Sequence, residues 1–177
     1  MARTRGPGRA GVVLPLVLVA ALVWWAVDRV GGDDRDGVDD AGSTTVAVQR
    51  VVDGDTLVVD GADRVRVLGI DTPETGGPRG RQCGGDEATR AATTLLDGQD
   101  VTLTGDPTQA ARDRFDRRLA YVTLPDGRDL AQVLLEQGWA RVYAPAGDVE
   151  RMDDYRDAER SARADGAGSW GRCPSFG

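Results

Sequence analysis

Two carboxylates flank a proline in the stretch GIDTPETG, residues 69–76. Pro73 fixes its own φ angle and forces Thr72 into an extended conformation, so this loop would hold its oxygen atoms in a stiff arrangement. Those oxygens are the carboxylates of Asp71 and Glu74 and the carbonyl of Thr72, which are hard donors of the kind that Ca²⁺ takes. Acids beside proline and glycine are also ordinary loop residues, so the stretch taken alone favours a solvated turn.

The other charged stretches also have a plain structural interpretation when each is taken alone. Arg66 lies five residues before Asp71 on the opposite face of a predicted strand, and it would approach Asp71 only if the strand bends at Gly69. The stretch VVDGDTL, with Asp53 and Asp55, is typical of a hairpin turn, and RDRFDRRLAY is typical of a polar turn before a strand. Each stretch gains functional meaning only in combination with the others.

The composition limits which chemistry is possible. The chain of 177 residues has no histidine and no lysine, so all 22 of its basic residues are arginines. The absence of histidine excludes Ser-His-Asp and Cys-His catalysis and most zinc sites. Any phosphate contact from a basic side chain must use a guanidinium group, which binds phosphate in bidentate fashion. The net charge of −7 argues against a passive nucleic-acid binder and fits either a protein that holds a divalent cation or one that is kept soluble.

The N-terminal region predicts export from the cytoplasm. Residues 11–27 carry no charge, and 17 helical residues would rise ~25 Å, at the short end for a membrane span. Three arginines precede this segment and place the N-terminus inside, and the length of the segment favours an uncleaved signal anchor over a cleaved signal peptide for residues 1–27. Residues 28–43 are rich in Gly and Asp and predict a solvated tether. We therefore expect residues 44–177 to form one extracytoplasmic domain, membrane-anchored, or secreted if the segment is cleaved.

The two cysteines, Cys83 and Cys173, predict one disulfide if the chain is exported. Such a bond would close a loop of ~90 residues and stabilise the fold by at most roughly 4–5 kcal/mol. The alternative is a pair of buried thiols.

The elements that must position these residues follow an order of strands and helices. Residues 44–71 predict three strands joined by tight turns. The remaining elements are a helix at 86–96, a strand at 100–106, a strand within 117–130, a helix over 128–143 and a charged helix within 147–171. Three meander strands, a helix and two more strands match a five-stranded OB-fold β-barrel, an α+β fold with three helices.

Taken together, VVDGDTL, VRVLGIDTPET, DRFDRRLAY and GWARVY resemble the staphylococcal nuclease (thermonuclease) family over most of residues 44–170. The resemblance implies a Ca²⁺-dependent phosphodiesterase, with a monomeric catalytic domain, that cleaves DNA and RNA, preferably where unpaired, to 3′-phosphate products. It also implies the site residues: Asp55, Asp71 and the Thr72 carbonyl as Ca²⁺ ligands with Asp53 nearby, Glu74 to orient or deprotonate the attacking water, Arg66 and Arg117 to clamp the scissile phosphate, and Phe115 and Tyr143 to contact the substrate.

The chain departs from the family pattern beside the phosphate clamp. Phe115 and Asp116 stand where the family usually has Tyr and Gly. Phe115 lacks a hydroxyl group but can stack on a base or sugar, and Asp116 either weakens substrate binding or holds Arg117 in place. GRQCGGDEA replaces a lysine-rich loop, so we expect lower nonspecific affinity for DNA. Two alternatives remain: a catalytically weak OB-fold nucleic-acid-binding module, and a Ca²⁺-stabilised wall-associated domain, which would leave the clamp arginines without a role.

Overall fold

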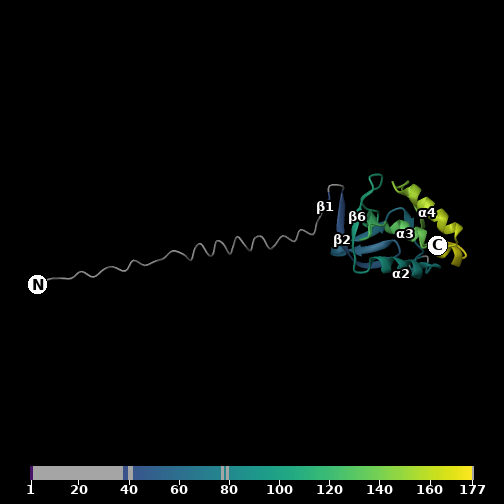
Figure 1. The fold of residues 1–177 in the computed structure, drawn as a ribbon, viewed down its shortest axis with the longest axis horizontal. Helices are drawn as coiled ribbons and strands as arrows, with labels where there is room; N and C mark the ends of the chain where they lie inside the picture. The colour runs from purple at the N-terminus through teal and green to yellow at the C-terminus, as the bar shows by residue number, and fades with distance from the viewer. Residues whose placement is uncertain (2–37, 40–41, 77, 79, 177) are drawn as a thin grey trace. The chain divides into compact units, whose positions relative to one another are not determined.

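The computed structural model describes Met1 and residues 38–39, 42–76, 78 and 80–176. The chain divides into two units, residues 1–35 and 36–177, and the elements below all belong to the second unit (Figure 1). The predicted apolar segment at 11–27 and most of the predicted tether lie outside the described residues. Within the described part of the chain, no helix is long and apolar enough to cross a membrane.

Five strands close into a barrel, as the sequence predicts. The strand order is β1-β2-β3-β4-β7-β6, and a further pairing of β2 with β6 closes the ring of β2, β3, β4, β7 and β6. The short strand β1 pairs with β2 and is not part of this ring. All of these pairings are antiparallel except that of β4 with β7, which is parallel. The bounds are β1 Val38–Asp39, β2 Ser43–Asp53, β3 Thr56–Val59, β4 Arg64–Val67, β6 Asp100–Thr104 and β7 Arg118–Thr123.

Closure of the barrel depends on β2, which pairs with two different strands. Its first half, Ser43 to Ala47, pairs with β6, and its second half, from Val48 onward, pairs with β3. The register shifts twice within the second half. Such irregularities increase the local bend and twist of a strand, and this curvature allows one long strand to belong to both sides of the barrel.

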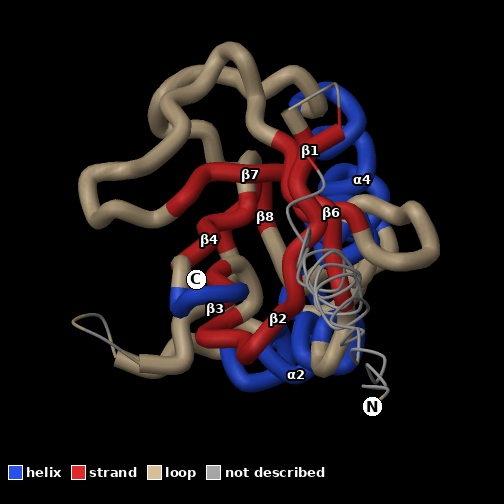
Figure 2. The backbone as a smooth tube through the Cα atoms, turned by 90° about the vertical axis from the view of Figure 1, so that its left-hand side faces the viewer, coloured by secondary structure: helices blue, strands red, loops and turns tan. Residues whose placement is uncertain are grey.

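The helices pack outside the barrel and complete its core. They are α2 Gly85–Leu96, α3 Leu130–Glu136, α4 Met152–Ala164 and the short α5 Ser169–Arg172. Helix α2 packs against β2 near one end of the barrel (Figure 2), and α3 packs against α4 (Figure 1). Asp129 caps α3 by accepting hydrogen bonds from two backbone N–H groups of its first turn. The most deeply buried side chains come from both layers, and they include Leu57, Val65, Ile70, Leu103, Leu134 and Tyr155.

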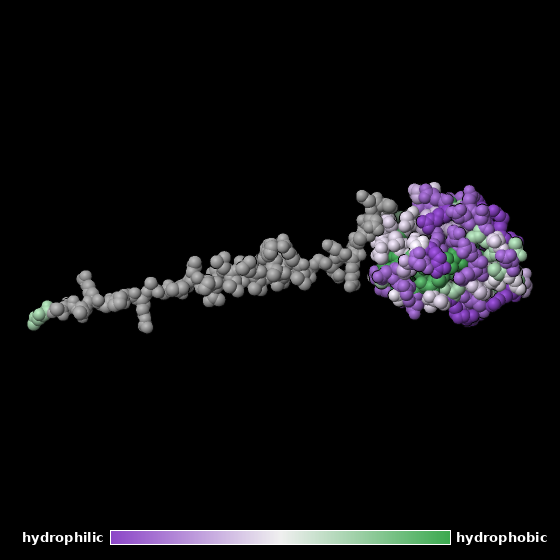
Figure 3. Space-filling model, viewed as in Figure 1, coloured by the Kyte–Doolittle hydropathy of each residue, from purple (hydrophilic) through white to green (hydrophobic). Residues whose placement is uncertain are grey.

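The molecular face in Figure 3 is mostly hydrophilic around a smaller hydrophobic area. The apolar side of α4 faces inward: Met152, Tyr155, Ala158 and Ala162 are buried, as the sequence predicts. The charged side chains of α4 form local pairs, such as Arg156 with Asp148, and they account for the high charge of this helix without a functional role.

The prediction of one helix over residues 128–143 is wrong in its second half. Helix α3 ends at Glu136, and Gly138 follows with a φ angle of +70°. Glycine adopts this left-handed conformation without steric cost, and it commonly terminates helices. Arg141–Val142 then form β8, which pairs with β5, Ile70–Asp71. The predicted charged helix is likewise divided into α4 and α5, because glycines with positive φ angles lie between them.

Candidate active site

The turn between β2 and β3 packs directly against the DTPET loop. Asp55 accepts hydrogen bonds at Oδ2 from the Thr72 backbone N–H at 2.8 Å and from the Thr72 hydroxyl at 3.2 Å. A Cβ atom at Gly54 would lie only 2.7 Å from Thr72 Cγ2, so this approach requires glycine. Asp53 stabilises the same turn, because its Oδ1 accepts the Asp55 N–H at 3.2 Å. Two segments that lie apart in the sequence thus bring predicted metal ligands together.

Arg66 joins the two carboxylates. Its Nη1 lies 3.1 Å from Asp55 Oδ1, and its Nη2 lies 3.3 Å from Asp71 Oδ1. The side chains of Arg66 and Asp71 would point to opposite faces of a regular strand. They meet because β4 ends at Val67 and Gly69 turns the chain with a φ angle of +78°. The bend at Gly69 that the sequence analysis required is therefore present.

Burial makes the charge of Asp55 costly. The residue is 5% exposed, and this burial is the main reason that the pKa of Asp55 rises to about 6. The positive charge of Arg66 and the hydrogen bond from Thr72 lower this pKa, while the negative charges of Asp53 and Asp71 raise it further. Additional positive charge at this position would therefore stabilise the ionised carboxylate.

Asp71 is held from its other side by a residue that the sequence analysis did not assign. Arg141 donates from Nε at 3.3 Å and from Nη2 at 2.9 Å to Asp71 Oδ2. The contact follows from the strand register, in which Asp71 of β5 lies opposite Arg141 of β8. Because this pairing joins residues 70 positions apart, no local pattern indicates it.

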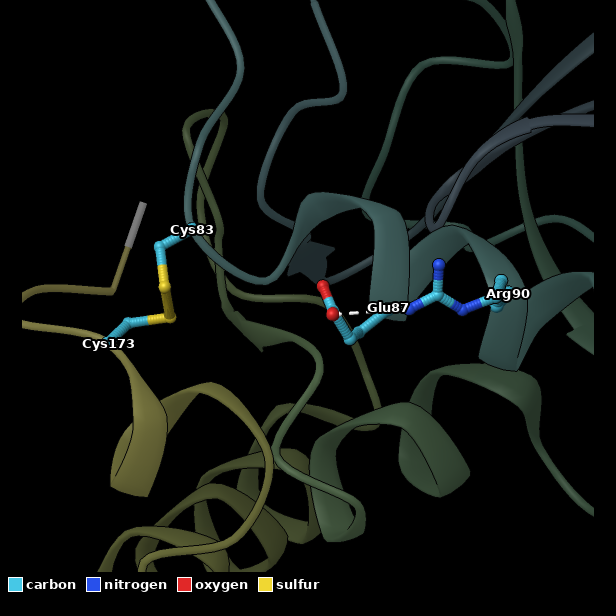
Figure 4. The surroundings of a disulfide bond; sticks show 4 residues. All are labelled: Cys83, Glu87, Arg90 and Cys173. Carbon is cyan, nitrogen blue, oxygen red and sulfur yellow. Dashed lines mark ion pairs between the residues drawn. A yellow bond between two sulfur atoms is a disulfide. The ribbon is translucent and has the colours of Figure 1, made fainter.

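The loop that carries Glu74 is fixed by its backbone. The Glu74 N–H donates to Gln82 Oε1 at 2.8 Å, and the Gln82 N–H donates to the Glu74 carbonyl at 2.8 Å. Gly85 packs so closely that a Cβ atom there would lie 2.5 Å from the same carbonyl oxygen. Cys83, next to Gln82, forms the predicted disulfide with Cys173, and Figure 4 shows this bond between the segment before α2 and the C-terminal segment.

Arg117 is held by Asp113 and not by Asp116. Arg117 donates from Nε to Asp113 Oδ2 at 2.7 Å, and its Nη2 lies 2.7 Å from the same oxygen. Burial alone would raise the pKa of Asp113, but the hydrogen bonds and charge of Arg117, with a bond from the Phe115 N–H, bring the pKa below its usual value. The side chain of Asp116 is 89% exposed and lies near Arg112. The Asp113–Arg117 pair has i,i+4 spacing, which is a signal that the sequence contained.

Arg117 is connected to the carboxylates through one hydroxyl group. Its Nη1 donates to Thr56 Oγ1 at 3.5 Å, and this hydroxyl donates to Asp55 Oδ1 at 3.2 Å. Asp55, Arg66, Asp71 and Thr72 therefore form one network of direct contacts, and Arg117 lies at its edge.

A cavity of about 410 Å³ lies beside this network. Arg66 and Arg117 line it together with Phe115 and Tyr143, two residues that are 60% and 46% exposed. The guanidinium carbons of Arg114 and Arg117 lie 4.7 and 5.5 Å from the centre of the Phe115 ring. The predicted substrate-contacting aromatic residues thus lie at the same cavity as the two arginines.

The donor set for a metal ion is small. Among the residues that the structure describes, no cluster of three or more Asp, Glu or Cys side chains could hold a metal ion. A cation at this site would use two carboxylates, Asp55 and Asp71, with the Thr72 carbonyl and water. This combination of hard oxygen donors suits Ca²⁺.

The fold and the site define an OB-barrel protein in which arginines line one cavity, and one of them, Arg66, also contacts the paired carboxylates of Asp55 and Asp71. Residues 64–172 match the family described as staphylococcal nuclease homologue. This match spans more than half of the chain, and the chain belongs to that family.

Several known proteins similar to this chain carry nuclease names. A thermonuclease of Staphylococcus intermedius is 34% identical over 148 residues, which cover 80% of this chain and 85% of that protein. Endonuclease YncB of Bacillus subtilis is 34% identical over 132 residues, which cover 72% of this chain and 62% of that protein. The SPbeta prophage-derived endonuclease YokF of the same organism has the same identity over 132 residues, but these cover only 44% of its length. The chain thus spans less than two thirds of the two Bacillus relatives.

Proposed function

We propose that this protein is a Ca²⁺-dependent phosphodiesterase that hydrolyses DNA and RNA to 3′-phosphate products outside the cytoplasm. The observation that carries the proposal is the convergence of Asp55, Arg66 and Asp71 beside a cavity that Arg66 and Arg117 line. A cavity with two guanidinium groups suits a phosphate diester, because arginine binds phosphate oxygens through paired hydrogen bonds. The nuclease names of similar proteins support the same assignment.

The residues fit a calcium ion. Asp55 and Asp71 would bind it with the Thr72 carbonyl, and Asp53 would add negative charge outside the ligand set. The raised pKa of Asp55, caused mainly by burial, supports this fit because a divalent cation would compensate the buried charge. When bound, the ion would polarise a phosphoryl oxygen and offset the charge that develops during hydrolysis.

The protein side chains supply the remaining functions. Arg66 and Arg117 stabilise the negative charge on the phosphoryl oxygens, and neither is suited to act as an acid because guanidinium does not release its proton in proteins. Glu74 acts on the attacking water. Its backbone is fixed on both sides by Gln82, so the loop has a defined position relative to Thr72.

The aromatic residues account for recognition of nucleic acid. Phe115 and Tyr143 present exposed rings at the cavity, where a base or sugar can stack against them. Stacking requires exposed faces of bases, so unpaired stretches of DNA or RNA are the preferred substrates. The arrangement does not require a basic surface elsewhere, in agreement with the net charge of −7.

The proposed function includes export from the cytoplasm. The disulfide between Cys83 and Cys173 supports it, because such bonds persist in oxidising compartments outside the cytoplasm. We propose that residues 1–27 direct the chain out of the cytoplasm and hold it at the membrane, or release it if they are cleaved. Comparison of the mature mass with the encoded mass tests this part, and a new N-terminus near residues 30–42 would overturn the anchor.

Cleavage of labelled single-stranded DNA and RNA by the full chain, in CaCl₂ and then in EGTA, tests the proposed activity. We expect cleavage only with Ca²⁺, with losses of ~10²–10⁴-fold in kcat for Glu74→Gln and for Arg117→Ala. Arg156→Ala, an exposed residue of α4, is the matched control and should cleave like the wild type. Binding without Ca²⁺-dependent cleavage would instead indicate the alternative, a nucleic-acid-binding module without activity.

A further inference from the structure

Arg141 contacts two distant parts of the chain through one side chain. Its Nε and Nη2 donate to Asp71 Oδ2 at 3.3 and 2.9 Å. Its Nη1 donates to the backbone carbonyl of Phe176 at 3.3 Å. The side chain of Arg141 is only 33% exposed, so the guanidinium group lies between Asp71 and the C-terminal tail.

We infer that Arg141 is a positioning residue that sets the orientation of the Asp71 carboxylate and fastens the C-terminal tail beside it. The inference rests on the proposed function, in which Asp71 binds Ca²⁺. Arg141 holds Oδ2 of Asp71, while Oδ1 lies on the side of Arg66, which joins it to Asp55. Two guanidinium groups thus fix both oxygens of one carboxylate, and the side chain cannot rotate without breaking one of these contacts.

The chemistry of the contact requires arginine. Three nitrogen atoms of one planar group reach two acceptors, and a lysine at this position would keep the positive charge without this geometry. Partners that orient a ligating carboxylate typically change metal affinity by ~10–100-fold when they are mutated. A substitution that preserves the charge therefore separates orientation of Asp71 from simple electrostatics.

The tail that Arg141 holds is itself anchored close to the Glu74 loop. Cys173 is bonded to Cys83, and the neighbouring Gln82 holds the Glu74 backbone. The ring of Phe176 lies 4.3 Å from that of Trp170, measured between centroids, which directs the tail back over α5. The tail therefore connects the loop of Glu74 with the strand pair of Asp71, and Arg141 is its contact with that pair.

The test compares Arg141→Lys and Arg141→Gln with the wild type in the full, disulfide-bonded chain. Arg156→Lys is the matched control, because Arg156 also binds one carboxylate through a bidentate contact, to Asp148 at 2.9 Å, but lies on the exposed side of α4. Calorimetric titration with CaCl₂ measures affinity. We expect the dissociation constant for Ca²⁺ to rise by ~10–100-fold in both Arg141 variants and to stay unchanged in the control.

A purely electrostatic role predicts a different pattern. Arg141→Gln removes a positive charge near a cation site, so electrostatics alone would tighten Ca²⁺ binding in this variant and leave Arg141→Lys unchanged. That pattern, or wild-type affinity in both variants, would overturn the inference. Nucleic-acid cleavage at saturating CaCl₂ is a second readout, because a positioning residue mainly shifts the Ca²⁺ concentration required and should leave much of kcat intact.

A metal-independent measurement separates the inference from the proposed function. Carboxypeptidase digestion in EGTA reports how firmly the tail is held, and near-ultraviolet circular dichroism confirms that each variant is folded. We expect faster removal of the last residues in Arg141→Lys than in the wild type or in Arg156→Lys. If the wild type neither binds Ca²⁺ nor cleaves nucleic acid, the proposed function fails, and the digestion rates still decide whether Arg141 holds the tail. Equal digestion rates in all three proteins would refute that contact.

Discussion

Replacing Asp55 by asparagine should change how the stability of the protein depends on pH. Burial is the largest cause that raises the pKa of Asp55 from 3.8 to about 6 in the folded protein. A carboxyl group with a raised pKa favours the folded state fully below the pKa of the unfolded chain, and this stability is lost as pH rises through the folded value. At neutral pH without metal, the ionised Asp55 therefore destabilises the fold.

The expected magnitude follows from the two pKa values. The interval from 3.8 to about 6, at about 1.4 kcal/mol for each pKa unit, corresponds to about 3 kcal/mol. Asparagine does not titrate, so the variant does not lose this free energy of unfolding as pH rises. The variant also loses the charge contact with Arg66, but this contact forms only when Asp55 is ionised, and its effect is already contained in the folded pKa of about 6. The free-energy difference between variant and wild type should therefore change by about 2 kcal/mol from pH 4 to pH 8, because pH 4 already lies above the unfolded pKa of 3.8 and part of the loss occurs below it.

Urea unfolding of the full chain in excess EGTA, at intervals between pH 4 and pH 8, measures this difference. Most carboxylates titrate alike in both proteins, so their contributions cancel in the comparison. With CaCl₂ in place of EGTA, the wild type should gain stability and Asp55→Asn should not, because the variant loses a ligand. A difference between the two proteins that is constant over the whole pH range would refute the argument from burial.

Two further substitutions test the loop that carries Arg117. Asp113→Asn keeps the size of the side chain but removes the charge that holds the Arg117 guanidinium, so kcat should fall by ~10–100-fold while the fold persists, since misplacement of a contacting group has effects of this order. Steady-state cleavage assays measure this loss, and an unchanged kcat would show that Asp113 does not position Arg117. Asp116→Gly should raise the free energy of unfolding by ~0.5–1 kcal/mol, because Asp116 has a φ angle of +61° that glycine adopts without cost. Thermal unfolding measures it, and a less stable variant would contradict the assignment of strain to this backbone.

The sequence predicts the barrel well because strong turn signals separate its first three strands. Asp53-Gly54 and Asp60-Gly61 interrupt the first three strands at places where no other element competes. The segment around Trp139 is different: its apolar spacing continues the helical pattern of α3, and only the left-handed Gly138 and the pairing of β8 with β5 decide against a helix. Tertiary pairing thus overrides the local pattern. The contact of Arg141 with Asp71 could not be predicted for the same reason.

Some residues of the site can be predicted from the sequence and others cannot. Asp55, Arg66 and Asp71 lie in motifs whose spacing is informative once the motifs are taken together. Arg141, which holds Asp71, and Gln82, which holds Glu74, are not marked in this way, because their contacts depend on the folded chain. Asp113 lies between these two cases. Its spacing of four residues from Arg117 is present in the sequence, but the neighbouring Asp116 is an equally plausible partner for Arg117 unless the backbone of the loop is known.

The pairing of each clamp arginine with a carboxylate does not oppose phosphate binding, because guanidinium has five N–H donors in a fixed plane. Arg66 contacts Asp55, Asp71 and the Val67 carbonyl and still has donors left for a phosphate oxygen. The carboxylates fix the plane in advance, so binding a phosphate costs little further ordering of the side chain. A lysine, with three donors at one nitrogen, could not hold a carboxylate and present a planar fork at the same time. This geometry does not explain why every basic residue of the chain is an arginine. At Arg66 and Arg117, however, the contacts require arginine.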